Sequence, residues 1–117
     1  MSPLTLYHNP RCSKSRQALQ LLEERGCDFH VRRYLDAPLS REELEALAAR
    51  LDGDVADLVR TQESDWKALQ LATPSADDYL AALAAHPRLM QRPLLDRGDR
   101  AVIGRPPENI LALIDAS

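Results

Sequence analysis

The sequence predicts an α/β fold in which a β-α-β unit at the start and a β-β-α unit at the end enclose a block of helices. Two observations support this prediction. Short apolar runs alternate with helical patterns at both ends of the chain, whereas residues 40–86 carry only helical patterns of leucine and alanine. A length of 117 residues with 44% hydrophobic residues fits one domain over residues 1–117, in which residues 40–86 form a helical insertion.

The first unit consists of a strand, a helix and a second strand. The first strand covers residues 4–7, and a turn follows at residues 9–10. A helix is expected over about 13–25, because alanine and leucine recur at helical spacing and Gly26 occupies the usual stop position. Residues 28–34 have the pattern of a second strand. A connection of this length implies parallel pairing with a right-handed crossover.

The middle block is predicted to contain four helices. Ser40 is placed to cap the first of them, with Glu43 at the capping-box position and Gly53 as the stop. The apolar stripe of this helix comprises Leu44, Leu47, Ala48 and Leu51. Three shorter helices are expected at 55–60, near 65–71 around the only tryptophan, and at 76–85, the last ending before His86-Pro87.

The end of the chain returns to strands. Residues 93–96 and 101–103 have the pattern of two strands that flank a hairpin turn at 97–100. Pro106-Pro107 then begins a last helix. The resulting order of strands and helices is that of the thioredoxin fold, with a helical block in its middle.

Composition and charge exclude several classes of protein. The formal net charge is −3 with acidic and basic residues mixed, whereas nucleic-acid-binding domains are basic or carry a basic stripe. The N-terminus lacks an apolar signal segment, and no apolar run reaches membrane-spanning length. We therefore expect a cytoplasmic protein without direct nucleic-acid or membrane binding. Because no heptad pattern is present, a monomer is expected.

The most informative segment is residues 8–16, which places a thiol where the first strand ends and the first helix begins. Cys12 there lies beside the unpaired N–H groups and the positive end of the helix dipole. Nearby positive or protonatable side chains are those of His8, Arg11, Lys14 and Arg16. These surroundings favour the thiolate, which is the nucleophilic form. The alternative, that Cys12 is a small buried apolar residue, would require no basic surroundings.

The second cysteine, Cys27, is not expected to form a disulfide with Cys12. If the intervening segment is helical, the two Cα atoms lie roughly 20 Å apart, whereas a disulfide needs Cα atoms within about 7 Å. We therefore expect Cys27 to be a structural residue at the opposite end of the first helix. No metal site is expected either, because no second cysteine or histidine follows Cys12 at ligand spacing.

Five short motifs follow one another along the chain. They are His8-Asn9-Pro10-x-Cys12-x-x-Ser15-Arg16, Tyr34-Leu35-Asp36-Ala37-Pro38, Leu58-Val59-Arg60, His86-Pro87-x-Leu89-Met90-x-Arg92-Pro93 and Ile103-Gly104-Arg105-Pro106. In this order they resemble the glutaredoxin-dependent arsenate reductase family, that is, the ArsC/Spx family of thioredoxin-fold proteins. The resemblance covers nearly the whole chain, and the five motifs together are far more specific than any one of them.

The resemblance implies roles for the matched residues. Cys12 would be the nucleophile, and His8 and Ser15 would help to hold it as a thiolate. The oxyanion site would be formed by Arg60, Arg92 and Arg105, joined by Arg16, and the Arg92–Pro93 bond would be cis. Guanidinium groups suit this task because they stay charged and match tetrahedral oxygens in bidentate geometry. Arsenate would be the substrate, glutathione the co-substrate and glutaredoxin the partner, with no bound cofactor.

Two departures from the family's patterns keep other functions open. Ser15 stands where a Cys-x-x-Cys motif has its second cysteine, which argues against a dithiol oxidoreductase and against the redox-sensing Spx branch. Ser13-Lys14 stands where arsenic-resistance members usually have Gly-Thr. The alternatives are therefore a monothiol glutathione-dependent thiol/disulfide reductase and an Spx-like regulator that binds RNA polymerase. The arginines favour arsenate reduction, because a disulfide substrate does not require an oxyanion site.

Overall fold

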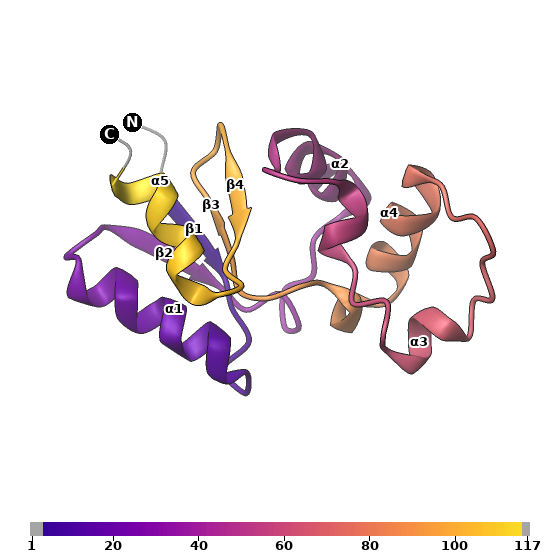
Figure 1. Ribbon diagram of the computed structural model, residues 1–117, viewed down its shortest axis with the longest axis horizontal. Helices are drawn as coiled ribbons and strands as arrows, with labels where there is room; N and C mark the ends of the chain where they lie inside the picture. Colours follow the sequence, from indigo (N-terminus) through magenta and orange to yellow (C-terminus); the bar gives the residue numbers. More distant parts are fainter. Residues whose placement is uncertain (1–3, 116–117) are drawn as a thin grey trace.

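The computed structural model describes residues 4–115. Its elements in chain order are β1 (Leu4–Tyr7), α1 (Ser13–Glu24), β2 (Phe29–Arg32), α2 (Arg41–Arg50), the 3-10 helix η1 (Val55–Leu58), α3 (Ser64–Lys67), α4 (Ala76–Ala85), the 3-10 helix η2 (Pro87–Leu89), β3 (Leu94–Asp96), β4 (Ala101–Ile103), the 3-10 helix η3 (Pro107–Leu111) and α5 (Ala112–Asp115). The four strands with α1 and α5 form one lobe, and α2, α3 and α4 form a second lobe beside it (Figure 1).

The four strands form one mixed sheet in the order β2-β1-β3-β4. β1 pairs in parallel with β2, as the β-α-β connection predicts, and antiparallel with β3. β3 and β4 form an antiparallel hairpin. This is the thioredoxin-like topology predicted from the sequence, with the helical insertion between β2 and β3.

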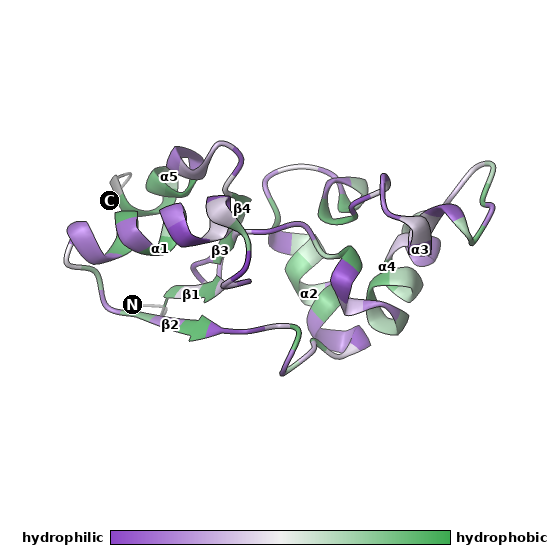
Figure 2. Ribbon diagram, turned by 90° about the horizontal axis from the view of Figure 1, so that it is seen from below, coloured by the Kyte–Doolittle hydropathy of each residue, from purple (hydrophilic) through white to green (hydrophobic). Residues whose placement is uncertain are grey.

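The core lies on both faces of the sheet, because successive strand residues point to opposite sides. Leu6, Leu95 and Val102 pack on one face against α1 and the C-terminal helices. Tyr7 and Leu94 pack on the other face against the insertion. Figure 2 shows the hydrophobic stretches of α2 and α4 within the second lobe. The sheet is thus packed between two sets of helices. The insertion packs against it through the apolar cluster that contains Tyr7 and Leu94.

Polar contacts and backbone pairs also fasten the insertion to the sheet. At the end of α2, Arg50 Nε donates to Oδ1 of the buried Asp96 at 2.9 Å. The hydroxyl of Tyr7 donates to Oδ2 of the same carboxylate at 3.3 Å. Burial of Tyr7, reinforced by the charge of Asp96, raises the pKa of its phenol to about 12, so the hydroxyl remains a donor. Leu51 forms a parallel β-bridge with Ala101 directly after α2.

Several predicted elements are shorter in the structure. The strand expected at 28–34 ends at Arg32, because the N–H groups of Asp36 and Ala37 bind the carbonyl of Arg33 in a turn. The segment 55–60 is a 3-10 helix only to Leu58 and then becomes extended. The helix expected near 65–71 is the single turn α3. The last helix begins in 3-10 form at Pro107.

Other local predictions are confirmed. Ser40 and Glu43 form the predicted capping box at the start of α2, although the helix ends at Arg50 and not at the predicted stop Gly53, because Leu51 is already extended. The helix α4 has the predicted bounds, and a second capping box, formed by Ser75 and Asp78, starts it. None of the helices within residues 4–115 combines the length and apolar character needed to cross a bilayer.

Candidate active site

The loop that carries Cys12 is closed by its own hydrogen bonds. The N–H of Cys12 donates to the carbonyl of Asn9 at 3.0 Å. The fully buried Ser15 accepts from the N–H of Asn9 at 3.0 Å, and its Oγ lies 2.7 Å from His8 Nδ1. Cys12 occupies the N-cap position of α1, in extended backbone conformation. The first turn of α1 and the preceding loop therefore hold the sulfur in one place.

Cys12 has the environment of a thiolate. The residue is only 9% exposed, and burial alone would raise the pKa of the thiol. The N–H groups of Ser15 and Lys14 and the charges of Arg92 and Arg105 act in the opposite sense and prevail, so the pKa of Cys12 lies below its usual value. A thiolate at a helix N-terminus beside arginines is an activated nucleophile.

His8 and Ser15 have a more indirect relation to the sulfur than the sequence analysis expected. Burial, followed by the charges of Arg33 and Arg16, lowers the pKa of His8, so the ring is held neutral. It therefore provides no positive charge for the thiolate. It contacts Ser15, and the group of Ser15 that stabilises the thiolate is the backbone N–H. The two side chains maintain the loop.

Arg16 was grouped with the oxyanion-binding arginines, and the structure separates it from them. Its side chain is exposed, and Nη1 donates to the carbonyl of Pro10 at 2.9 Å. A residue at the end of the first turn of α1 reaches back over the loop instead of forward past the sulfur. The contact clamps the loop from outside.

Arg60 is brought to the site by a backbone pairing. Val59 forms an antiparallel bridge with Met90. The N–H of Arg60 donates to the carbonyl of Leu89, and the N–H of Gln91 donates to the carbonyl of Leu58, both at 2.7 Å. The segment after η1 therefore runs beside the segment that leads to Arg92.

Arg92 and Arg105 are joined through the two loops that contain them. The Arg92–Pro93 bond is cis, as the resemblance implied, and the Arg105–Pro106 bond is cis as well. The N–H of Gly104 donates to the carbonyl of Pro93 at 2.9 Å, and Arg105 Nε donates to the carbonyl of Arg92 at 2.8 Å. A guanidinium nitrogen of Arg105 then lies 3.8 Å from Cys12 Sγ.

Arg92 has unused hydrogen-bonding capacity. Its Nε and Nη1 atoms are buried and have no hydrogen-bond partner among the described residues. Burying unpaired N–H groups of a guanidinium is costly, and an anion would relieve that cost. We call Arg60, Arg92 and Arg105 the arginine group. It is suited to a tetrahedral oxyanion next to the thiolate.

The arginine group lines a cavity of about 380 Å³, which we call the anion cavity. Its wall is formed by Val59, Arg60, Thr61, Gln62, Glu63, Gln91, Arg92 and Arg105. Burial and then the neighbouring charge of Arg92 lower the pKa of Arg60, while Glu63 acts in the opposite sense. Arg60 Nη1 forms an ion pair with Glu63 Oε1 at 2.6 Å.

Two residues near the site were given no role from the sequence, namely Tyr34 and Glu63. Tyr34 is 1% exposed and lines a cavity together with Asn9. Burial is the main cause that raises the pKa of this phenol, so it stays protonated. Its placement depends on the turn that ends β2 early. Glu63 reaches the arginine group because the short helix α3 begins directly after it.

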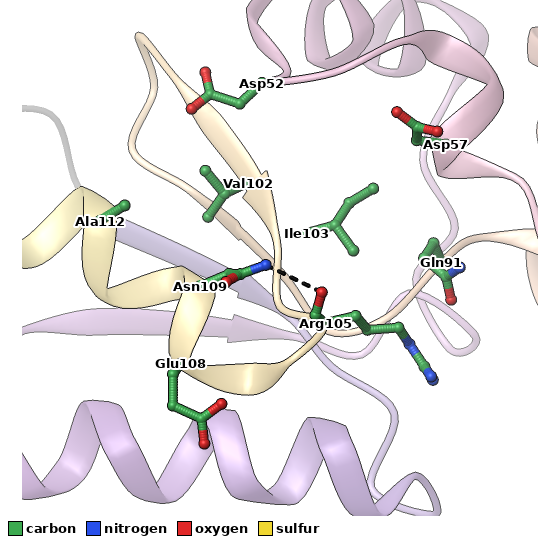
Figure 3. A pocket seen from close by; sticks show the side chains of 9 residues that line it. All are labelled: Asp52, Asp57, Gln91, Val102, Ile103, Arg105, Glu108, Asn109 and Ala112. Atoms are coloured by element: carbon green, nitrogen blue, oxygen red, sulfur yellow. Dashed lines mark hydrogen bonds between the residues drawn. The ribbon is translucent and has the colours of Figure 1, made fainter.

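A larger cleft lies between the insertion and the C-terminal helices. It has a volume of about 630 Å³ and is lined by Asp52 and Asp57 of the insertion and by Glu108, Asn109 and Ala112 from the other side, among other residues (Figure 3). Arg105 and Gln91 are its only residues in common with the anion cavity. Figure 3 shows the guanidinium of Arg105 at its margin, pointing away from Asp52.

The described residues contain no group of three or more histidine, cysteine, aspartate or glutamate side chains arranged to hold a metal ion. Both cysteines are free, and Cys27 follows the end of α1 opposite to Cys12. The groups that the described residues bring together here are the thiol of Cys12, the three guanidinium groups and the carboxylate of Glu63.

Comparison with known proteins shows to which family this chain belongs. Residues 7–113 match the sequence model of the ArsC family. The arsenate reductase of Neisseria meningitidis serogroup A is 41% identical over 117 residues, covering 97% of this chain and 100% of that protein. The arsenate reductase of Haemophilus influenzae is 39% identical over 112 residues, covering 93% and 97%. The solved arsenate reductase from Vibrio cholerae has a TM-score of 0.87 at 40% identity, covering 94% of this chain and 96% of its own. With this match and these relatives, the chain belongs to the ArsC family.

Proposed function

We propose that this protein reduces arsenate to arsenite, with Cys12 as the nucleophile and with glutathione and a glutaredoxin as the source of electrons. One observation carries the proposal. A cysteine of lowered pKa lies 3.8 Å from the guanidinium of Arg105, beside Arg92, whose buried N–H groups have no partner among the described residues. The similarity to proteins named arsenate reductase, at about 40% identity, supports the choice of substrate.

The first step is covalent attack on arsenic. Arsenate carries negative charge on tetrahedral oxygens, which the arginine group and the N–H groups at the start of α1 bind. The thiolate of Cys12 forms a bond to arsenic while one As–O bond breaks, and the oxygen takes up protons and leaves as water. Arsenic remains in oxidation state V, and the guanidinium groups stabilise the charge on its remaining oxygens.

The two electrons come from two external thiols. Glutathione replaces a second oxygen on arsenic, so that the adduct holds two sulfur atoms. The thiolate of a glutaredoxin then attacks the glutathione sulfur and forms a mixed disulfide, and the electron pair of that As–S bond stays on arsenic. Arsenic(V) becomes arsenic(III), and water cleaves the remaining bond to Cys12 to release arsenite. External thiols are needed because Ser15 stands at the resolving position and Cys27 lies beyond the other end of α1.

The proposal is tested by a coupled assay that follows NADPH oxidation in the presence of glutathione, glutathione reductase and a glutaredoxin. We expect turnover that requires arsenate and that is abolished in Cys12→Ser, a small change at a residue whose loop is held by other groups. Cys27→Ser is the matched control and should retain turnover. Full activity of Cys12→Ser would exclude Cys12 as the nucleophile. Absence of arsenate-dependent turnover, with Cys12 shown to be reduced, would contradict arsenate reduction, and turnover with a glutathione mixed disulfide would then identify a thiol/disulfide reductase.

A further inference from the structure

The anion cavity contains one carboxylate among its arginines. Glu63 lines this cavity and also a second one of about 310 Å³ that is bounded by Asn9, Tyr34 and Arg88, among others. Its Oε1 lies 2.6 Å from Nη1 of Arg60. Glu63 also occupies the N-cap position of α3, yet its side chain makes no capping hydrogen bond. The carboxylate is therefore paired with Arg60 of the arginine group and not with the N–H groups of its own helix.

A carboxylate in this position is unfavourable for a simple anion site. It repels a bound anion and takes up part of the hydrogen-bonding capacity of Arg60. A carboxylate can only accept hydrogen bonds, and an anion whose oxygens are all deprotonated has no O–H to donate to it. An anion that retains an O–H can donate to it and convert the repulsion into a charge-assisted hydrogen bond. The carboxylate thus favours tetrahedral anions that retain an O–H over those that do not.

Phosphate and arsenate keep at least one O–H at neutral pH, whereas sulfate has none, although phosphate and sulfate have nearly the same size and shape. We propose that Glu63 is a specificity-determining residue, which accepts the O–H of a protonated tetrahedral oxyanion at the arginine group and thereby excludes fully deprotonated anions such as sulfate. The inference rests on the proposed oxyanion site. It adds a substrate class, namely protonated oxyanions, and a residue that selects it.

The magnitude follows from charge repulsion and from the one hydrogen bond that only a protonated anion can donate. The side chain of Glu63 is 41% exposed and is already paired with Arg60, so a ligand without an O–H meets the repulsion and gains no compensating hydrogen bond. Hydrogen bonds to charged groups are worth enough to separate two ligands by about tenfold or more. Building in a group that opposes the wrong ligand is a common route to specificity.

The experiment is isothermal titration calorimetry of the full chain with inorganic phosphate and with sulfate at neutral pH. We expect the wild type to bind phosphate at least about tenfold more tightly than sulfate. In Glu63→Gln the ratio should fall toward unity, mainly because sulfate binds more tightly once the repulsion is removed. Glu42→Gln is the control for net charge, since Glu42 is exposed on α2 and lines neither cavity. It should keep the wild-type ratio.

Several results would overturn the inference. Equal affinities of the wild type for phosphate and sulfate would do so without any variant, so the test does not depend on the folding of Glu63→Gln. A wild-type preference that persists unchanged in folded Glu63→Gln would assign the selectivity to another group while leaving the oxyanion site intact. Failure of both anions to bind the wild type would remove the oxyanion site itself, and with it both the proposed function and this inference.

Discussion

The cysteine loop and the arginine group come together where Arg105 lies 3.8 Å from Cys12 Sγ, but they are held in different ways. The loop is stabilised by contacts within residues 8–16, such as the pair of His8 and Ser15. The arginine group is assembled from three segments far apart in sequence, through the bridge of Val59 with Met90 and the contact of Gly104 with Pro93. Positioning of the nucleophile is therefore a local property, whereas anion binding depends on how the insertion and the sheet pack together.

This difference predicts two kinds of failure. A change within the loop should reduce stability, since it leaves buried polar groups without partners. A change of an arginine that has unpaired N–H groups should reduce anion binding at little cost to stability, because its buried Nε and Nη1 have no hydrogen-bond partner among the described residues.

The largest effect is expected for Arg92→Ala. Its buried Nε and Nη1 have no partner among the described residues, so its removal takes away anion contacts and a charge that favours the thiolate. Loss of one preorganised donor to a developing oxyanion lowers turnover by about 10²- to 10³-fold. Steady-state kinetics with arsenate and thermal denaturation should be measured together. Arg41→Ala on α2 is the control for net charge and should keep its activity. If Arg92→Ala lost stability in proportion to activity, Arg92 would be a structural residue.

The next effect is expected for Gly104→Ala, which tests the contact that joins the two proline loops. A Cβ atom at this position would lie 2.8 Å from Pro93 Cγ and 3.0 Å from a methyl group of Ile110. Overpacking of this kind costs about 1–3 kcal/mol. Because the displaced segment carries Arg105, the free energy of unfolding and the affinity for phosphate should both fall. Denaturant titration and calorimetry measure the two effects. Unchanged phosphate affinity in a destabilised variant would show that Arg105 keeps its place independently of this contact.

A smaller effect is expected for Ser15→Ala within the loop. The change removes the oxygen that accepts from Asn9 and contacts His8, leaving buried polar atoms unpaired at a cost of about 1–2 kcal/mol. The thiolate should remain, because it is stabilised by the backbone N–H of Ser15, which the variant retains. Ser13→Ala, at an exposed position on the same helix, is the matched control for denaturation. A marked rise of the Cys12 pKa in Ser15→Ala would mean that the hydroxyl acts on the sulfur directly.

The same contrast explains what the sequence could predict. Features set by local chemistry were predictable from the sequence. Examples are the bounds of α4 and the capping box that Ser40 and Glu43 form at the start of α2. The position of Cys12 at the start of α1 followed from the strand, the turn and the helical pattern around it. These features depend on residues within a few positions of one another, and that information is present in any short window of the sequence.

Features that depend on distant segments were not predictable. Spacing alone did not separate Arg16, which turns back onto Pro10, from the three arginines that meet at the cavity. Tyr34 was assigned to a strand, and only the packing of the insertion against the sheet brings it into one cavity wall with Asn9. The position of Glu63 depends on where the single turn α3 begins, and a turn this short has bounds that a periodic pattern cannot fix, since the predicted helix was placed near 65–71.

The last prediction concerns pH and gives the smallest effect. Alkylating agents attack the thiolate, so the rate of modification falls as the pH falls through the pKa of Cys12. Since that pKa is lowered, the midpoint in a Cys27→Ser background should lie below that of free cysteine. Arg92→Ala and Arg105→Ala each remove a positive charge that favours the thiolate, so each should move the midpoint upward and leave the protein less reactive at neutral pH. The shift should be larger for Arg92, whose charge acts more strongly on the sulfur. Unchanged midpoints in both variants would mean that the local N–H groups of α1 alone account for the thiolate and that the arginine group serves only to bind the anion.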